Sequence, residues 1–494
     1  SAKARAQSAT VRGVDRKRAP ISPIVLVWLA MGLAAQFFGT PSDWRPQVMV
    51  LGVIGAVHAA VYFWRDGTQR ISAPGVYMLA GGLFAFFPAI YLCIDDPIGG
   101  GRVDYRPAVN IVYFSQILLY HFAWEPRRVR QAAPGIQPPA ALKSWGSSWG
   151  IILILVGVLL ARTPLAAFGV DDGCAYSGAV LLAMAVFQSP RALTPLAYLA
   201  VGASFLIFIE FVFSGFGRLQ VGALGIAMAM GATHRWKGRR VKTMLLLGLG
   251  PVLLHLAQSR KQMTALINPA QPDSVTGFES VISPLVRFAQ LLELEAAGEL
   301  DLTWGKSFLA ALVSFVPRQI WPEKPIGLGA ELAARFRPEL VGTGHSELAL
   351  TYGEWLLAFG KIGIPLMIVV VGISIYQADR IYGRFSGASL PNRAGLLAKT
   401  GLVVIIASIS DFFWGGAFSY TARVGPRLAA LILVLIVGAW PDARDRRRAD
   451  TVSPKARQVR SGPADPDRRP NRAGRTSTGE SFSRSGARGR AQQE

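Results

Sequence analysis

Long apolar runs, separated by short polar segments, recur along most of the chain. The hydrocarbon core of a membrane is roughly 30 Å thick, and a helix needs about 17–25 mostly apolar residues to cross it. A helix satisfies its own backbone hydrogen bonds in lipid, so the runs predict an all-α polytopic membrane protein. We count about twelve such spans, with approximate limits of 21–39, 46–64, 73–93, 107–124, 147–168, 174–188, 193–213, 219–233, 242–257, 357–377, 396–413 and 424–440.

These spans divide the chain into five parts. A cytoplasmic basic arm (1–20) precedes spans one to nine (21–257), and one long external loop (258–356) separates them from spans ten to twelve (357–440). Residues 441–494 are rich in Arg, Ser, Pro and Gly and have almost no large apolar side chains, which predicts a disordered cytoplasmic tail. Long ordered loops usually carry function, so the loop is the first place to look for a site.

The distribution of arginine and lysine predicts the orientation, because short cytoplasmic loops are enriched in both. Basic clusters fall in the N-terminal arm and in alternate loops, at Arg65 and Arg70, residues 127–130, residues 234–240, and Arg380 with Arg384. Both termini are therefore expected in the cytoplasm, with the long loop on the outer face.

Composition agrees with a membrane protein, since 51% of the residues are hydrophobic and 17% are charged. The net charge of +22 comes largely from the two tails. No nucleic-acid-binding pattern accompanies those basic residues, so we expect membrane lipids and no nucleic acid as their partners. Cys93 and Cys174 lack the spacing of metal or redox motifs and are expected as free thiols, with a disulfide as the alternative. No nucleotide-binding glycine motif is present, so no cofactor or metal is expected.

Two short helices are predicted inside the external loop. Apolar residues recur at helical spacing from Val281 to Leu294, which indicates an amphipathic helix packed on the membrane side of the loop. The apolar stretch from Ser307 to Val316 is too short to span a membrane and is expected to be re-entrant or interfacial.

Several arginine and lysine residues lie in the predicted external loops, although the positive-inside tendency depletes such residues there, so their presence needs an explanation. They are Arg218, Arg260, Lys261, Arg318, Lys324, Arg335 and Arg337. One interpretation is an anion pocket, because guanidinium groups bind phosphate oxygens in a bidentate geometry. The alternative is that they reach ordinary lipid phosphates or pair with nearby acids. These acids are Asp273, Glu279, Glu293, Glu295 and Glu299.

Three stretches, in this order along the chain, resemble one family. FSGFGRLQVGALGIAMAM (213–230) resembles the arginine-bearing turn and following helix of the O-antigen ligase and polymerase superfamily. FVPRQIWPEKP (315–325) and GHSELALTYGEWLLAFGKIGIP (344–365) resemble segments of its Wzy-like oligosaccharide repeat-unit polymerases, on either side of the end of the external loop. The resemblance covers roughly residues 200–375, and the earlier spans match only in being hydrophobic.

The resemblance implies a GT-C-like bundle and a metal-independent glycosyltransferase of a bacterial cytoplasmic membrane, with its active site on the external face. Such enzymes transfer a glycan from one polyprenyl diphosphate to the terminal sugar of a second lipid-linked glycan, which makes the two lipid-linked glycans its partners. Other envelope-polysaccharide proteins are possible partners. The energy lies in the donor's pyrophosphate linkage, so no nucleotide is needed.

The resemblance also suggests roles for individual residues. Arg218, Arg260 and Lys261 would bind the donor diphosphate, and Arg318 with Lys324 would stabilise its developing charge. Prolines around Trp321 would fix these cations, although the same segment is also consistent with a rigid interfacial turn anchored by Trp321. The remaining candidates are His345 as general base, Glu347 as the second choice, and Glu210 and Asp411 as acids that orient Arg218 or Arg423 or are simply hydrated.

Three alternatives stay open at this point. A GT-C enzyme with a polyprenyl-phosphate sugar donor would use an acidic residue in the first external loop, where Asp43 lies. An O-antigen-type ligase would use an acceptor that is not lipid-linked. A lipid-linked glycan transporter or flippase would need a polar path through the spans, whereas ionisable residues are expected only near their outer ends.

Overall fold

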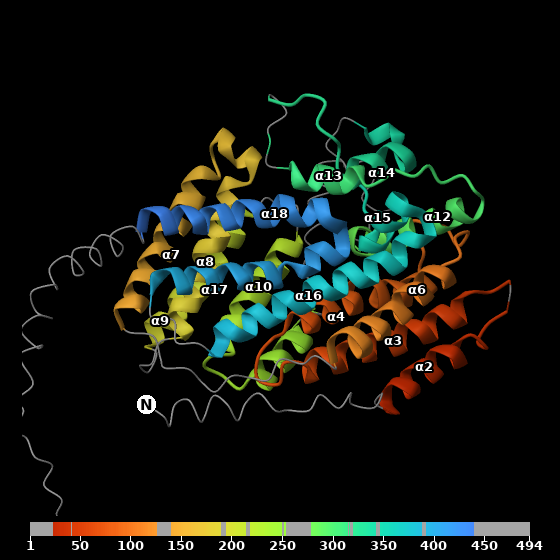
Figure 1. Cartoon of the computed structure of the whole chain (residues 1–494), viewed down its shortest axis with the longest axis horizontal. Coiled ribbons are helices and arrows are strands. Elements are labelled where there is room, and N and C mark those ends of the chain that lie inside the picture. The colour runs from red at the N-terminus through yellow and green to blue at the C-terminus, as the bar shows by residue number, and fades with distance from the viewer. Residues whose placement is uncertain are drawn as a thin grey trace, which may run out of the picture. The chain divides into compact units, whose positions relative to one another are not determined.

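The computed structural model describes residues 23–40, 42–125, 140–188, 194–213, 218–248, 251–252, 278–314, 316, 320–341, 346–387 and 392–438 (Figure 1). In this part of the chain the regular structure is helical throughout. Its α-helices are α2 (Pro23–Ala35), α3 (Arg45–Arg65), α4 (Ala73–Gly81), α5 (Phe87–Ile94), α6 (Arg106–Leu118), α7 (Ala140–Leu160), α8 (Val170–Phe187), α9 (Pro195–Ile207), α10 (Arg218–Ala232), α12 (Glu279–Ala296), α13 (Lys306–Leu312), α14 (Leu328–Phe336), α15 (Leu350–Phe359), α16 (Gly363–Gly387), α17 (Arg393–Ala407) and α18 (Ile409–Gly438).

Seven helical segments in the described ranges are long and apolar enough to cross a membrane. They are Arg45–Arg65, Ala73–Ile94, Ala141–Leu160, Val170–Phe187, Pro195–Val212, Leu350–Phe385 and Ile409–Gly438. Two shorter apolar helices cover Pro23–Ala35 and Leu219–Ala232. A polytopic, all-helical membrane protein is therefore confirmed for the described chain, while the count of about twelve spans and the GT-C-like arrangement stay predictions.

Several of these helices are irregular. The π-helical segments η1 (Gly82–Phe86), η2 (Leu119–Trp124) and η5 (Phe208–Val212) extend α4, α6 and α9. Helix α18 is broken at Gly416, where φ is 75° and ψ is −168°. Such interruptions often mark functional positions in membrane helices, because they free backbone groups inside the protein.

Loops gather at two opposite ends of the helices, as the basic residues predict. At one end Arg106 donates to the Thr40 carbonyl (3.3 Å), and the Asp104 amide donates to Glu293 on α12 (3.0 Å). At the other end Arg70 pairs with Asp379 (2.6 Å). There the Gly238 amide also donates to Gln69 (3.0 Å). The segments predicted to be external and cytoplasmic thus separate, although the face that each end occupies remains a prediction.

Helices α7 and α8 pack closely because small residues face each other. A Cβ atom added at Gly178 would lie 2.6 Å from the Gly150 carbonyl oxygen, and one added at Gly157 would lie 2.6 Å from the Cβ of Ala175. Small residues let membrane helices approach until their backbones touch, which increases dispersion contact where lipid provides no hydrophobic drive. This pair is therefore held mainly by shape.

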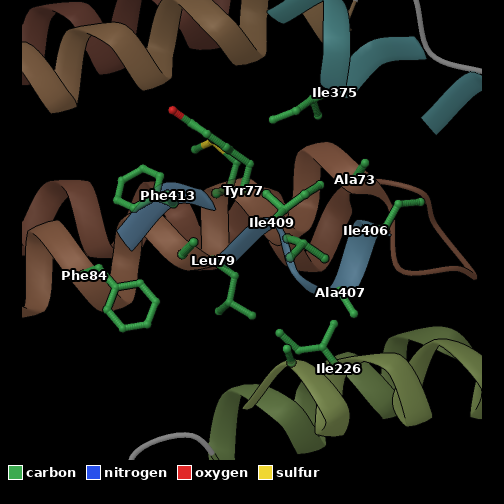
Figure 2. Close-up of a cluster of buried hydrophobic side chains, with 14 of the residues drawn as sticks. Ala73, Tyr77, Leu79, Phe84, Ile226, Ile375, Ile406, Ala407, Ile409 and Phe413 are labelled. Atoms are coloured by element: carbon green, nitrogen blue, oxygen red, sulfur yellow. The ribbon is translucent and has the colours of Figure 1, made fainter. Parts of the chain in front are cut away.

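The apolar core continues where α4, α10, α16, α17 and α18 meet (Figure 2). Tyr77 of α4 packs edge-to-face against Phe413 of α18, with ring centroids 5.1 Å apart. Figure 2 also shows Ile226 and Ala407 on the opposite side of this cluster. The core therefore fixes the first half of α18, on the N-terminal side of its break.

Candidate functional site

The described part of the external loop packs onto the broken helix α18. Helices α13, α14 and α15 each contact α18, and α12 contacts α15 (Figure 1). The predicted amphipathic helix is confirmed as α12, with Ile282, Leu285, Phe288 and Leu291 buried. The predicted short helix in the stretch from Ser307 is confirmed as α13. Sequence periodicity was enough for α12, and the length of an apolar run was enough for α13.

One of the three motif segments meets the residues that follow another beside the break in α18. The Glu347 amide donates to the Gly329 carbonyl oxygen (3.0 Å), which ties the segment after His345 to the start of α14. Gly327, two residues after Pro325, lies so close to Phe418 that an added Cβ would be 2.4 Å from its ring. The residues directly after the WPEKP turn and the Glu347 segment therefore share one place, next to the second half of α18.

The break itself is closed by a buried carboxylate. Glu354 of α15 is 1% exposed, and its Oε2 accepts a hydrogen bond from the Ala417 amide at 2.6 Å. This amide opens the second half of α18, where a negative charge is favoured by the free N–H groups and the helix dipole. Gly416 has no space for a side chain, since an added Cβ would lie 2.3 Å from Oε2 of Glu354. Glu354 thus acts as the N-terminal cap of a half-helix inside the protein.

Two arginines of the second half of α18 pair with acids of the first half and of α8. Arg423 Nη1 lies 2.6 Å from Asp411 Oδ1, and fully buried Arg427 lies 3.2 Å from Asp172 and 3.8 Å from Asp411. The Arg427 guanidinium also stacks on Tyr176, with Cζ 3.8 Å from the ring centroid. Two positive and two negative groups form a cluster without net charge, which limits the cost of burying them. The expected orientation of Arg423 by Asp411 is present in this cluster.

Glu347, the second choice for general base, is bound to an arginine. Its Oε2 lies 3.0 Å from Nε of Arg287 on α12, and both side chains are buried. Arg287 Nη1 also donates to Gln290 at 2.8 Å, and its guanidinium lies over the Phe336 ring. A base must be able to take up a proton, and a bound arginine favours the charged carboxylate. Glu347 would therefore have to leave Arg287 before it could act.

Lys324 is held by backbone carbonyl groups just beyond α13. Its Nζ donates to the carbonyl oxygens of Ser314 (3.1 Å) and Val316 (2.8 Å). A lysine at such carbonyls satisfies acceptors that a helix end leaves open. Trp321 in the same turn is 38% exposed. These contacts are those of the rigid-turn interpretation, and Lys324 would contact a diphosphate only if its hydrogen bonds rearranged.

Several of the predicted site residues and their proposed acidic partners lie outside the described residues. They are Arg260, Lys261, Arg318, His345 and Asp273. The side chains of Arg218, which begins α10, and of Glu279 also lie outside the described part. Glu210 lies in η5 with an exposed side chain.

The two described cations of α14 and its end lie near acids. Arg335 lies 3.5 Å from Asp301, and Arg337 lies 3.5 Å from Glu339. Both pairs include exposed groups, so each contributes little to stability. Partial burial raises the pKa of Glu331 on α14, and the nearby Arg335 and Lys306 oppose the rise. The alternative of acid pairing thus applies to Arg335 and Arg337, although with different acids from those expected.

No family model, curated protein or solved structure matches this chain. Within the described ranges no group of three or more His, Cys, Asp or Glu side chains could hold a metal ion, and Cys93 and Cys174 are free. Any functional conclusion therefore depends on the residues themselves.

Sequence reasoning missed four charged residues of this region: Arg287, Glu354, Asp172 and Arg427. A signal existed for Arg287, which lies on the apolar face of a predicted amphipathic helix, four residues before buried Leu291. Single charges within apolar runs signalled Glu354 and Arg427, because charge in a span usually has a partner. The partners themselves could not be read, since they come from other helices.

The expectation that ionisable residues lie only near the outer ends of the spans was wrong. His58 is fully buried in the middle of α3, and His121 is 5% exposed in η2. The expectation was drawn from charged side chains. It did not apply to histidine, which apolar surroundings tolerate in its neutral form.

Proposed function

We propose that the protein is a glycosyltransferase that polymerises polyprenyl-diphosphate-linked oligosaccharide repeat units on the outer face of a bacterial cytoplasmic membrane. The observation that carries the proposal is the meeting of the Glu347 segment with the start of α14, directly after the WPEKP turn, beside the break in α18. One motif and the residues that follow another thus converge where a helix is interrupted and where Arg423 lies within reach of the surface, with 19% of its side chain exposed.

Glycosyl transfer from a lipid diphosphate requires cations around the leaving diphosphate and a base near the acceptor hydroxyl. When the bond from the donor sugar to phosphate breaks, the diphosphate keeps the electron pair and its negative charge grows. Arg218, Arg260 and Arg318 would stabilise this charge, with Lys261 and Lys324 nearby. The acceptor hydroxyl would attack the sugar carbon and give its proton to the base, so that one new glycosidic bond replaces one phosphate ester.

His345 is the better base of the two candidates. Glu347 is bound to Arg287 and buried, whereas His345 precedes it by two residues in a glycine-rich stretch. We expect His345→Gln to lower turnover on the order of 10²–10⁴-fold while donor binding stays nearly unchanged. Glu347→Gln should keep turnover within about tenfold and act mainly on stability, because it weakens the pair with Arg287.

The test uses purified full-length protein in proteoliposomes and lipid-linked oligosaccharides extracted from cells that lack it. Longer lipid-linked glycans and released polyprenyl diphosphate, measured by mass spectrometry in equal amounts, would support the polymerase. Transfer only to an acceptor without a lipid diphosphate would replace it by a ligase. Glycan translocation without a new bond would reject the glycosyltransferase altogether.

A lipid-linked glycan transporter is the second candidate, because two observations favour it. Helix α18 is discontinuous, and discontinuous helices form substrate sites in many transporters. Polar side chains such as His58 and Gln116 are also fully buried among the helices. By contrast, Asp43 gives the polyprenyl-phosphate enzyme little support, since its carboxylate already accepts a hydrogen bond from the amide of Arg45, the first residue of α3.

A further inference from the structure

Two histidines lie side by side in the interior of the helices nearest the N-terminus. The ring centroids of His58 in α3 and His121 in η2 are 5.8 Å apart. Both nitrogens of His58 and Nε2 of His121 have no hydrogen-bond partner among the described residues. A neutral imidazole has one donor and one acceptor, and leaving a buried polar atom unpaired is unfavourable. Three ring nitrogens are therefore available for hydrogen bonds to water or to one another, as donor or acceptor according to the tautomer.

Aromatic rings enclose this histidine pair. Trp28 of α2, Tyr62 of α3 and Tyr113 of α6 lie with ring centroids 4.9, 4.6 and 6.4 Å from that of His58. Their polar atoms bind one another, since Trp28 Nε1 donates to the Tyr62 hydroxyl (3.0 Å) and the Tyr113 hydroxyl donates to the Trp28 carbonyl (2.7 Å). Those hydroxyl groups are thus hydrogen-bonded to Trp28, and the two imidazole rings face each other.

The pair has an outlet to solvent at Glu125. His121 Nδ1 lies 2.7 Å from Glu125 Oε2, and the Glu125 side chain is 22% exposed while that of His121 is fully buried. The outlet lies at the Arg65 end of α3, because the Arg65 guanidinium covers the ring of Tyr62, which contacts His121. The titratable and charged groups around the pair are Tyr62, Tyr113, Tyr120, Arg65, Asp66 and Glu125.

We propose that Glu125, His121 and His58 form a proton relay from the solvent at the Arg65 end into the interior of the helices. A proton from water binds the Glu125 carboxylate and passes to Nδ1 of His121. His121 then releases the proton on its other nitrogen, Nε2, to His58, directly or through one water molecule. One transfer moves one proton from water to His58, and the loaded pair gains one positive charge. Chains of carboxylate and histidine inside a membrane commonly serve this purpose, and π-helical segments such as η2 often hold functional residues.

The relay is independent of the proposed transferase activity, so it is tested by spectroscopy. The chain has five histidines, so selective ¹⁵N labelling of histidine in the full chain in nanodiscs gives few ring signals. His58→Gln and His121→Gln serve only to assign them. We expect the ring nitrogens of His58 and His121 to exchange their protons with water at comparable rates. Glu125→Gln should change the tautomer of His121 and slow proton exchange at His58 on the order of tenfold or more.

His234 is the matched control. It is half-buried with an unpartnered Nε2, and it lies in the turn after α10, beside Lys399. Its signal should not respond to Glu125→Gln, and Glu125→Asp should restore part of the exchange rate at His58. Signals of His58 and His121 that do not respond to Glu125→Gln would overturn the relay. An equal response of His234 would overturn it as well, because the effect would then be a general change of the fold.

Discussion

Gly416 shows how much one residue decides in this protein. Its φ of 75° and ψ of −168° lie in a region that only glycine occupies easily. Gly416→Ala should therefore cost on the order of 1–3 kcal/mol and also displace Glu354, which lowers the melting temperature in detergent. Gly425→Ala, in the same helix, is the control, because no atom lies within 4 Å of its added Cβ. Equal melting temperatures for the two variants would show that the break is not held by Gly416.

At the same scale, the sequence could not reveal the role of Gly416. Glycine is frequent in membrane helices, so a Gly-Gly pair in an apolar run predicts no interruption. The break depends on Glu354, which comes from a separate helix more than fifty residues earlier. His345 and Glu347 could be proposed from residue type alone, but the pairing of Glu347 with Arg287 required the fold.

Among the elements, the close contact of α7 with α8 depends most clearly on glycine residues. We expect Gly178→Val to destabilise the protein by about 1–3 kcal/mol, because the added methyl groups would push the two backbones apart. Gly202→Val in α9 provides the comparison, since nothing lies within 4 Å of the added Cβ there. The measurement is thermal unfolding in detergent. A loss at Gly202 as large as that at Gly178 would contradict the role of close packing.

Helices were easier to predict than their partners. Apolar length predicted α3 and α8, and apolar periodicity predicted α12, because both signals arise from the solvent that each face meets. The contact of α7 with α8 has no such signal, since a small residue that faces another helix looks the same in sequence as one that faces lipid. The contacts of α13, α14 and α15 with α18 were equally invisible.

For the whole molecule, the separation of the loops into two ends makes orientation measurable. Ser42 and Lys237 are exposed at opposite ends. In a chain with Cys93 and Cys174 replaced by serine, we expect Ser42→Cys to react with a membrane-impermeant maleimide in intact cells. Lys237→Cys should react only after the membrane is opened. The reverse pattern would invert the orientation and move the proposed transferase site to the cytoplasm.

The buried pair of Arg427 and Asp172 has a consequence for how the protein is made. An arginine at the centre of a helix opposes release into lipid by about 2.5–3.5 kcal/mol on translocon-insertion scales. The segment containing Arg427 emerges last among the described helices, whereas Asp172 on α8 is synthesised more than two hundred residues earlier. The last span should therefore insert best when α8 is already next to the translocon, so that Arg427 enters the membrane paired with Asp172. Asp172→Ala should leave this span partly uninserted in newly made chains even where the earlier spans are in place.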